Sequence, residues 1–171
     1  MAPDPHHRSD IAATRIAILT VSDTRTPETD TSGKAAQELV TRNGHRVVDY
    51  RIVPDEPERV REIVSHWLGQ TDLDVIIVNG GTGVSARDRT YEALETLLDK
   101  KLDGFAELFR ALSFEEIGAR AMLSRALGGV ARSKAIFSVP GSTAAVRLAL
   151  ERLILPEIGH LIAELRKGVG S

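Results

Sequence analysis

Residues 74–90, DVIIVNGGTGVSARDRT, decide the fold of this chain. An apolar run at 75–78 leads into a glycine-rich loop, and a helical pattern begins at Thr90. A short apolar run flanked by glycines is typical of a strand buried on both faces of a parallel sheet. Glycines at the carboxyl end of such a strand let backbone N–H groups approach a ligand, and the following helix start favours anions. The segment therefore predicts a site for a phosphate-bearing ligand, the alternative being a glycine-rich turn without one.

The same loop contains a second pattern, because residues 81–86 fit the G-x-G-x-x-G/A fingerprint of dinucleotide-binding folds. In those folds the loop follows the first strand, and an acidic residue about 20 positions later binds the ribose. Here at least two predicted strands come before the one that leads into the loop, and no apolar strand leads to Asp103, the acidic residue near that spacing. A nicotinamide cofactor is thus the weaker alternative. A P-loop is excluded, because the chain has no G-x-x-x-x-G-K-[ST] motif.

The composition is that of an ordinary globular domain. The chain has 171 residues, 42% of them apolar and 27% charged, which is enough to bury a full core. Its net charge of −2 argues against nucleic acid as a partner. The chain lacks cysteine and any apolar run of the 18 or so residues that span a bilayer, so we expect a cytoplasmic protein without membrane contact. Residues 1–13 are expected to be a disordered tail, not a signal peptide, and 14–168 a single domain.

Apolar runs and helical periodicities alternate along the chain. Strands are predicted at 15–21, 46–53, 75–78 and 133–139. Helices are predicted with Ser32 as a cap, with residues 55–58 as the opening turn, and at 90–99, 105–112, 119–127, 143–155 and 157–167. The segment 114–118 is expected to be irregular, Gly128 and Gly129 to close the preceding helix, and Pro156 to separate the last two helices. This alternation predicts an α/β fold with a mostly parallel sheet and helices on both faces.

Four predicted loops follow the carboxyl ends of the strands, at 22–32, 54–56, 80–88 and 140–142. Such ends share one edge of a parallel sheet, so their side chains are expected to converge there. The polar residues of these loops are Ser22, Asp23, Asp30, Ser32, Asp55, Thr82, Ser85, Asp88 and Ser142. They offer hydroxyl groups for phosphate and carboxylates for Mg²⁺, but no histidine. This set suits phosphoryl or nucleotidyl transfer better than acyl transfer.

Helix capping is the alternative role for several of these residues. Asp55 stands three positions before Glu58 with Pro57 between them, which is a good N-cap arrangement. Asp88, Ser32 and Ser142 also precede predicted helices, although Thr90 is a better cap than Asp88.

Six motifs, in order, resemble the MoaB/MogA family of molybdenum cofactor biosynthesis proteins and the related domain of MoeA and gephyrin. The motifs are SDTR…DTSG at 22–33, PDE at 54–56, NGGTGVSARDRT at 79–90, LDGFAELFRALSFEEIG at 102–118, LSRALGG at 123–129 and VPGSTAAV at 139–146. The sequences LSFEEIG and PGST are similar to those of the MoaB branch of the family. The resemblance implies a three-layer α/β/α, Rossmann-like fold, assembly into trimers or hexamers, and binding of molybdopterin. It also implies adenylylation of molybdopterin with Mg-ATP, the alternative being a non-catalytic carrier or scaffold of the same pathway, with other pathway proteins as further partners.

The resemblance also assigns roles to individual residues. It implies that Asp55 and Asp88 are catalytic and hold Mg²⁺. It implies that the ligand-binding positions are Asp23, Asp30, Ser32, Gly33, Gly80, Gly81, Thr82, Gly83, Ser85, Pro140, Gly141 and Ser142. Tyr91 departs from the family pattern, because proline is frequent at that position, and Val84-Ser85-Ala86 replaces other loop variants.

The segment 105–117 is amphipathic and carries more apolar surface than a connecting segment should expose. Large exposed apolar patches usually become interfaces, so the segment is expected at or near a contact in a homo-oligomer. The alternative is that it packs on its own sheet, with Phe105, Phe109 and Phe114 in the core rather than on a base-stacking surface.

Overall fold

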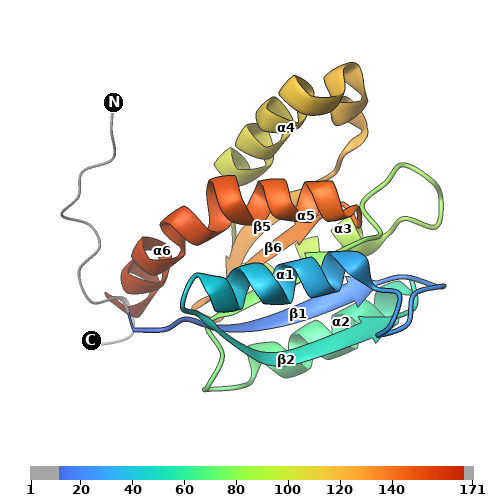
Figure 1. Ribbon diagram of the computed structural model, residues 1–171. Helices are drawn as coiled ribbons and strands as arrows, with labels where there is room; N and C mark the ends of the chain where they lie inside the picture. Colours follow the sequence, from blue (N-terminus) through green and yellow to red (C-terminus); the bar gives the residue numbers. More distant parts are fainter. Residues whose placement is uncertain (1–11, 168–171) are drawn as a thin grey trace.

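The computed structural model describes residues 12–167 (Figure 1). The predicted tail therefore lies outside the described residues except for Ala12 and Ala13, and so does Gly168, the predicted end of the domain.

Six strands form one mixed sheet in the order β2-β1-β3-β6-β5-β4. The strands are β1 (Arg15–Val21), β2 (Arg46–Val53), β3 (Val75–Asn79), β4 (Lys100–Lys101), β5 (Leu127–Ala131) and β6 (Lys134–Val139). The pairs β1–β2, β1–β3 and β3–β6 are parallel, whereas β5 runs antiparallel to both β6 and β4. The predicted mostly parallel sheet is confirmed, because β5 alone among these strands runs in the opposite direction, and the neighbouring strands β2, β1, β3 and β6 end at the same edge.

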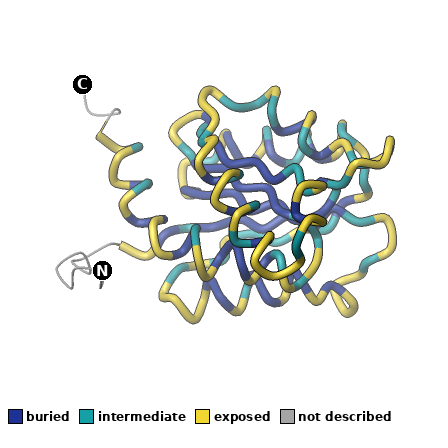
Figure 2. The backbone as a smooth tube through the Cα atoms, turned by 90° about the horizontal axis from the view of Figure 1, so that it is seen from above, coloured by how far each residue is buried: buried dark blue, intermediate teal, exposed yellow. Residues whose placement is uncertain are grey.

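Helices cover both faces of this sheet. They are α1 (Thr31–Arg42), α2 (Pro57–Leu68), α3 (Thr90–Glu95), α4 (Asp103–Ile117), the 3₁₀ helix η2 (Gly118–Leu123), α5 (Thr143–Ala149), the π turn η3 (Leu150–Ile154) and α6 (Leu155–Lys167). Successive strand residues point to opposite faces, so Ile77 packs toward α1, α4, α5 and α6 while Ile76 packs toward α2 and α3. The buried strands lie between the two helical layers (Figure 2). The three-layer α/β/α architecture is confirmed.

The predicted helix at 119–127 is correct only in part, because residues 119–123 lie in the 3₁₀ helix η2, whereas Leu127 begins β5. Gly128 and Gly129 lie inside this strand. A Cβ atom at Gly128 would be 2.8 Å from the Cβ of Phe105, and one at Gly129 would be 2.5 Å from Cδ1 of Leu98. The two glycines therefore do not end a helix. They let the side chains of Phe105 and Leu98 pack closely against β5, which is a known role of glycine within a strand.

Three helix boundaries also differ from the prediction. The helix that begins at Thr90 ends at Glu95, well short of residue 99. The segment 114–118, expected to be irregular, is helical as far as Ile117, the last residue of α4. Pro156 does not separate two helices, because it is the second residue of α6, directly after η3. A proline lacks the N–H that an α-helix needs, and a π turn is one of the distortions that accommodate such a defect.

Asp74 links three elements at the amino edge of the sheet. Its Oδ2 accepts from Nε of Arg15 at 3.0 Å, and its Oδ1 accepts from Nη2 of Arg15 at 3.0 Å and from Nη2 of Arg166 at 3.1 Å. The side chain is 8% exposed. Burial alone would raise the pKa of this carboxyl group, but the hydrogen bonds from Arg15 and Arg166 lower it to about 2. The contact ties β1 and α6 to the residue that precedes β3.

We expect Asp74→Asn to lower the free energy of unfolding at pH 7 by about 2 kcal/mol, since the pKa of Asp74 falls from 3.8 to about 2 on folding. A lowered pKa in the folded state stabilises above the unfolded pKa, so the contribution is complete above about pH 4 and disappears as the pH falls through 2. Urea unfolding of both proteins between pH 7 and pH 2 measures this difference. The exposed neighbour Asp72 is the control, and a pH-independent difference for Asp74→Asn would contradict the expectation.

Candidate functional site

The carboxyl edge of the sheet carries a cleft of about 570 Å³. Its walls come from the loops after β1, β3 and β6 on one side and from α4 and η2 on the other. The residues that line it are Val21, Ser22, Thr24, Arg25, Gly80, Gly81, Thr82, Gly83, Asp88, Ile117, Arg120, Leu123, Ser124, Pro140 and Gly141. Small-molecule sites in proteins usually have a volume of this order. Three of the four loops expected to converge therefore line one ligand-sized cleft, whereas the loop 54–56 contributes no residue to its lining.

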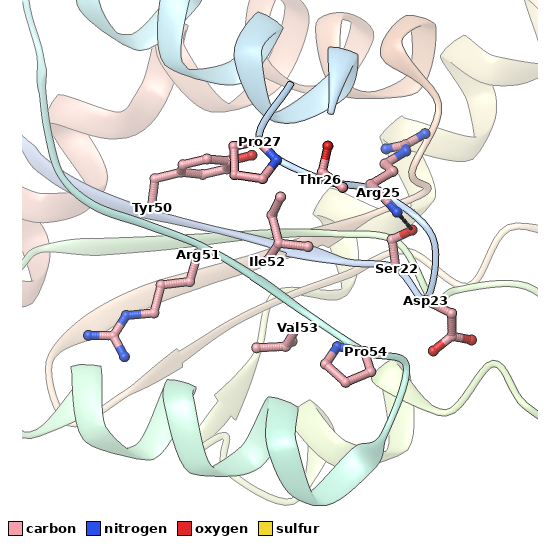
Figure 3. Close-up of a pocket in the computed structure, with 10 residues that line it drawn as sticks. All are labelled: Ser22, Asp23, Arg25, Thr26, Pro27, Tyr50, Arg51, Ile52, Val53 and Pro54. Atoms are coloured by element: carbon pink, nitrogen blue, oxygen red, sulfur yellow. Dashed lines mark hydrogen bonds between the residues drawn. The ribbon is translucent and has the colours of Figure 1, made fainter. Parts of the chain in front are cut away.

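A second cleft, of about 560 Å³, lies on the other side of the loop after β1 (Figure 3). The loop contributes Ser22, Asp23, Arg25, Thr26 and Pro27, and β2 with Pro54 contributes the rest of the lining. Ser22 and Arg25 line both clefts, so the two are adjacent. The edge of the sheet thus offers two neighbouring spaces separated by one loop.

The glycine-rich loop after β3 packs too closely for side chains. Gly80 and Gly81 have positive φ angles of 105° and 65°. A Cβ atom at Gly80 would be 2.2 Å from the carbonyl oxygen of Val21, and one at Gly83 would be 2.7 Å from Oδ2 of Asp88. Glycine is the residue that tolerates such angles and approaches. The loop is consequently held against the end of β1 and against Asp88.

Asp55 presents an unpaired buried oxygen to this loop. Its Oδ1 has no hydrogen-bond partner and lies 3.1 Å from the position that a Cβ of Gly81 would take; Oγ1 of Thr90, also buried and unpaired, lies 2.0 Å from the same position. Burial, followed by the negative charges of Asp88 and Asp23, raises the pKa of Asp55. Buried polar atoms normally have partners, so the unpaired carboxylate oxygen of Asp55, beside the glycine-rich loop, is a place for a cation or a ligand donor.

Neither Asp55 nor Asp88 caps a helix, and the capping alternative is wrong for both. The N-cap of α2 is Glu56 and that of α3 is Arg89, and neither makes a side-chain cap bond. Oδ2 of Asp88 instead accepts from the backbone N–H of Ser85 at 3.1 Å. Thr90 is the first residue of α3 rather than its cap.

Asp23 joins the loops that carry the two aspartates. Its Oδ1 accepts from the backbone N–H of Asp55 at 3.1 Å, and its Oδ2 accepts from Nε of Arg87 at 2.7 Å. The bond from Arg87 is the main reason why the pKa of Asp23 is lowered. Three loops that are distant in sequence therefore meet around Asp23, Asp55 and Asp88, as the parallel topology predicts.

Asp30, Ser32 and Gly33 lie beneath the clefts in a buried network. Asp30 is the N-cap of α1, accepting from N–H of Gly33 at 3.0 Å and from the hydroxyl of Tyr50 at 2.5 Å. Ser32 is therefore inside the helix and not its cap, and its hydroxyl donates to Oδ1 of Asn79 at 2.8 Å. Asp30 and Ser32 have no exposed surface. Their side chains support the end of β3 from below.

The turn after β6 divides its residues between two roles. Pro140 and Gly141 line the first cleft, whereas Ser142 caps α5 by accepting from the backbone N–H of Ala145 at 3.1 Å, so capping is confirmed for this residue. Ser85 is exposed, and its hydroxyl accepts from the N–H of Arg87.

Sequence reasoning missed the residues that hold the loops in place. Arg25 donates from Nη2 to the carbonyl of Gly141 at 2.9 Å and from Nη1 to the hydroxyl of Ser32. Asn79 donates to Oγ1 of Thr20 at 3.0 Å, and Arg125 binds the carbonyl of Gly83. Each of the three lies within or beside a motif, but only the fold reveals its partner.

A glycine-rich loop at the carboxyl edge of an open α/β sheet, with carboxylates beside it, defines a ligand-binding α/β protein. Residues 17–160 match the family model described as "Probable molybdopterin binding domain". The chain belongs to this family, and the resemblance noted in its motifs is confirmed. Among the described residues, every helix is too short or too polar to traverse a bilayer.

Known proteins and structures resemble the chain over nearly its whole length. A "Molybdenum cofactor biosynthesis protein B" of Halalkalibacterium halodurans is 49% identical over 98% of this chain and 99% of its own. A crystal structure of a "Molybdenum cofactor biosynthesis protein B" is 50% identical with a TM-score of 0.90 and covers 92% of this chain and 99% of its own. The crystal structure of a "tungsten cofactor synthesizing protein MoaB" from Pyrococcus furiosus is 34% identical with a TM-score of 0.81, and the match covers 90% of this chain and 98% of that protein's chain.

Proposed function

We propose that this protein acts in molybdenum cofactor biosynthesis, binds molybdopterin at the carboxyl edge of its sheet and adenylylates the phosphate of molybdopterin with Mg-ATP. The observation that carries the proposal is the meeting of Asp55, Asp88 and Asp23 around the glycine-rich loop, with Oδ1 of Asp55 buried and unpaired. The names of the similar proteins support the pathway. The carboxylates support the reaction.

The described residues contain no group of three or more acidic, histidine or cysteine side chains that could hold a metal ion by itself, so a magnesium ion here would also need ligands from the substrate. Mg²⁺ prefers oxygen ligands and is usually held by one or two carboxylates together with substrate phosphates. Asp55 and Asp88 would hold it, because Oδ1 of Asp55 lacks a partner and Asp88 lines the cleft. When bound, the ion would offset the negative charge that the triphosphate carries.

The proposed reaction is a nucleotidyl transfer. An oxygen of the molybdopterin phosphate forms a bond to the α-phosphorus of ATP, the bond from that phosphorus to its bridging oxygen breaks, and pyrophosphate leaves. This chemistry requires positioning and charge compensation rather than a protein nucleophile, which agrees with a site built from backbone N–H groups and carboxylates. The two adjacent clefts provide neighbouring places for two substrates.

Incubation of the protein with molybdopterin, ATP and Mg²⁺ tests the proposal directly. Adenylylated molybdopterin and pyrophosphate are the expected products, separated by liquid chromatography. Absence of both products from folded protein would exclude the enzymatic function. The alternative, a non-catalytic carrier or scaffold, predicts molybdopterin binding that is indifferent to ATP and Mg²⁺.

The apolar face of α4 and η2 supports assembly into a trimer or a hexamer. Leu108, Phe114, Ile117, Met122 and Leu123 are all exposed on these two helices, Met122 at 77% and Phe114 at 62%. Phe105 and Phe109 are buried as expected, but placing Phe114 in the core is wrong. Apolar patches of this kind usually mark interfaces.

Sedimentation velocity at micromolar concentration should show the oligomer. Phe114→Glu is expected to shift the protein to the monomer, because it places a charge on the apolar face, whereas Val48→Glu on the exposed side of β2 should leave assembly unchanged. A monomeric wild-type protein would contradict this part of the proposal.

A further inference from the structure

Arg125 connects the wall of the first cleft to the glycine-rich loop. It lies in the short link between η2 and β5. Its backbone N–H donates to the carbonyl of Thr82 at 3.3 Å, its Nε donates to the carbonyl of Gly83 at 2.9 Å, and its Nη2 donates to the carbonyl of Asp88. One guanidinium group therefore binds both ends of the loop 83–88.

The same guanidinium group contacts the first turn of α3. Its Nη1 pairs with Oε1 of Glu92, and its Cζ lies 5.6 Å from the centroid of the Tyr91 ring. The side chain is half-buried by these contacts. Hydrogen bonds from a charged donor are about twice as strong as neutral ones, and they strengthen further where water is partly excluded. Arg125 thus holds the loop and the following helix in one arrangement.

The other contacts of the loop fix its shape more than its position. The N–H of Ser85 donates to Oδ2 of Asp88 at 3.1 Å, and the N–H of Asp88 donates to the carbonyl of Ser85 at 3.0 Å, so both bonds are internal. The pair between Arg87 and Asp23 reaches outside the loop, but it is solvent-exposed, and exposed ion pairs contribute little. The loop tip is open to solvent, with Val84 exposed at 67%.

We propose that Arg125 is a positioning residue that places Asp88 at the cleft by binding the carbonyl groups at both ends of the loop. The assignment rests on the proposed function in so far as Asp88 is the acidic group that acts on the ligand. It requires the planar fork of arginine, because the single ammonium group of lysine cannot reach the carbonyls of Gly83 and Asp88 together with Glu92 in this geometry.

Hydrogen exchange of the Ser85 and Asp88 amides, measured by NMR, tests the positioning role without any substrate. We expect Arg125→Met and Arg125→Lys to speed exchange at both amides roughly tenfold or more, because charge-assisted bonds to the loop are lost. Amides of β3 should keep their protection. The matched control is Arg59→Met on the exposed face of α2, which should leave the loop amides unchanged.

Loop exchange within twofold of wild type in both variants would overturn the proposal. If the β3 amides lose protection in Arg125→Met alone, the exchange of the loop amides in Arg125→Lys, which keeps the length and the charge of the side chain, decides between the outcomes. If the β3 amides lose protection in both variants, Arg125 stabilises the whole fold, and the positioning role is also overturned. In the adenylylation assay, Arg125→Lys should lower kcat roughly tenfold with KM for ATP nearly unchanged. If the wild-type protein has no adenylylation activity but the Arg125 variants show the expected faster exchange of the loop amides, the proposed function is refuted and the positioning role stands.

Discussion

Asp88→Asn is expected to lower the rate of adenylylation roughly a hundredfold or more while molybdopterin binding persists. The substitution keeps the shape of the side chain and an oxygen that can accept from the N–H of Ser85. It removes the negative charge at the cleft, and charge stabilisation of a transferring phosphoryl group by a bound metal ion is worth several kcal/mol. Since Asp88 does not cap α3, little change in stability is expected.

Single-turnover adenylylation and equilibrium binding of molybdopterin separate the two effects. Asp72→Asn, an exposed position at the opposite edge of the sheet, is the matched control and should retain the wild-type rate. A rate for Asp88→Asn within about threefold of wild type, far less than a metal effect would cost, would show that the charge is not needed. Loss of molybdopterin binding together with the rate would instead assign Asp88 to the binding of that substrate.

The parallel core of the fold was predictable because its signals are local. The apolar runs of β1 and β3 and the helical periodicity of α1 and α2 are visible within single segments. The hairpin of β5 and β6 was not, because LGGVA has no alternating pattern and its turn residues, Arg132 and Ser133, have φ angles of 47° and 60°. Sequence rules reserve such turns for glycine, asparagine and aspartate. Pairing with β6, a non-local interaction, makes this segment a strand.

In the candidate site, too, some features were predictable from the sequence and others depend on non-local contacts. The convergence of Asp23, Asp55 and Asp88 follows from topology alone, since the loops after parallel strands share an edge. Whether a polar side chain in such a loop points outward or inward depends on partners from other elements. Asp30 turns inward because Tyr50 and the N–H of Gly33 bind its carboxylate, and no spacing in the sequence reveals that contact.

Gly80→Ala is expected to cost roughly 3 kcal/mol or more of unfolding free energy. Two penalties combine at this position. A φ angle of 105° strains any residue with a side chain, and the added Cβ would lie 2.2 Å from the carbonyl oxygen of Val21. That oxygen belongs to the backbone at the end of a buried strand, so no rotation of a flexible side chain relieves the contact.

Gly44→Ala separates the two penalties. Gly44 has a φ angle of 82°, but a Cβ there would have no atom within 4 Å, so only the conformational strain of about 1 kcal/mol applies. Urea unfolding of both variants therefore measures the steric contribution as a difference, and equal losses would show that β1 yields to the methyl group. Any Gly80→Ala protein that still folds must have separated the loop from the end of β1. Because the same loop carries Gly81 and Gly83 past Asp55 and Asp88, its displacement should also weaken ligand binding, whereas Gly44→Ala should bind as wild type does.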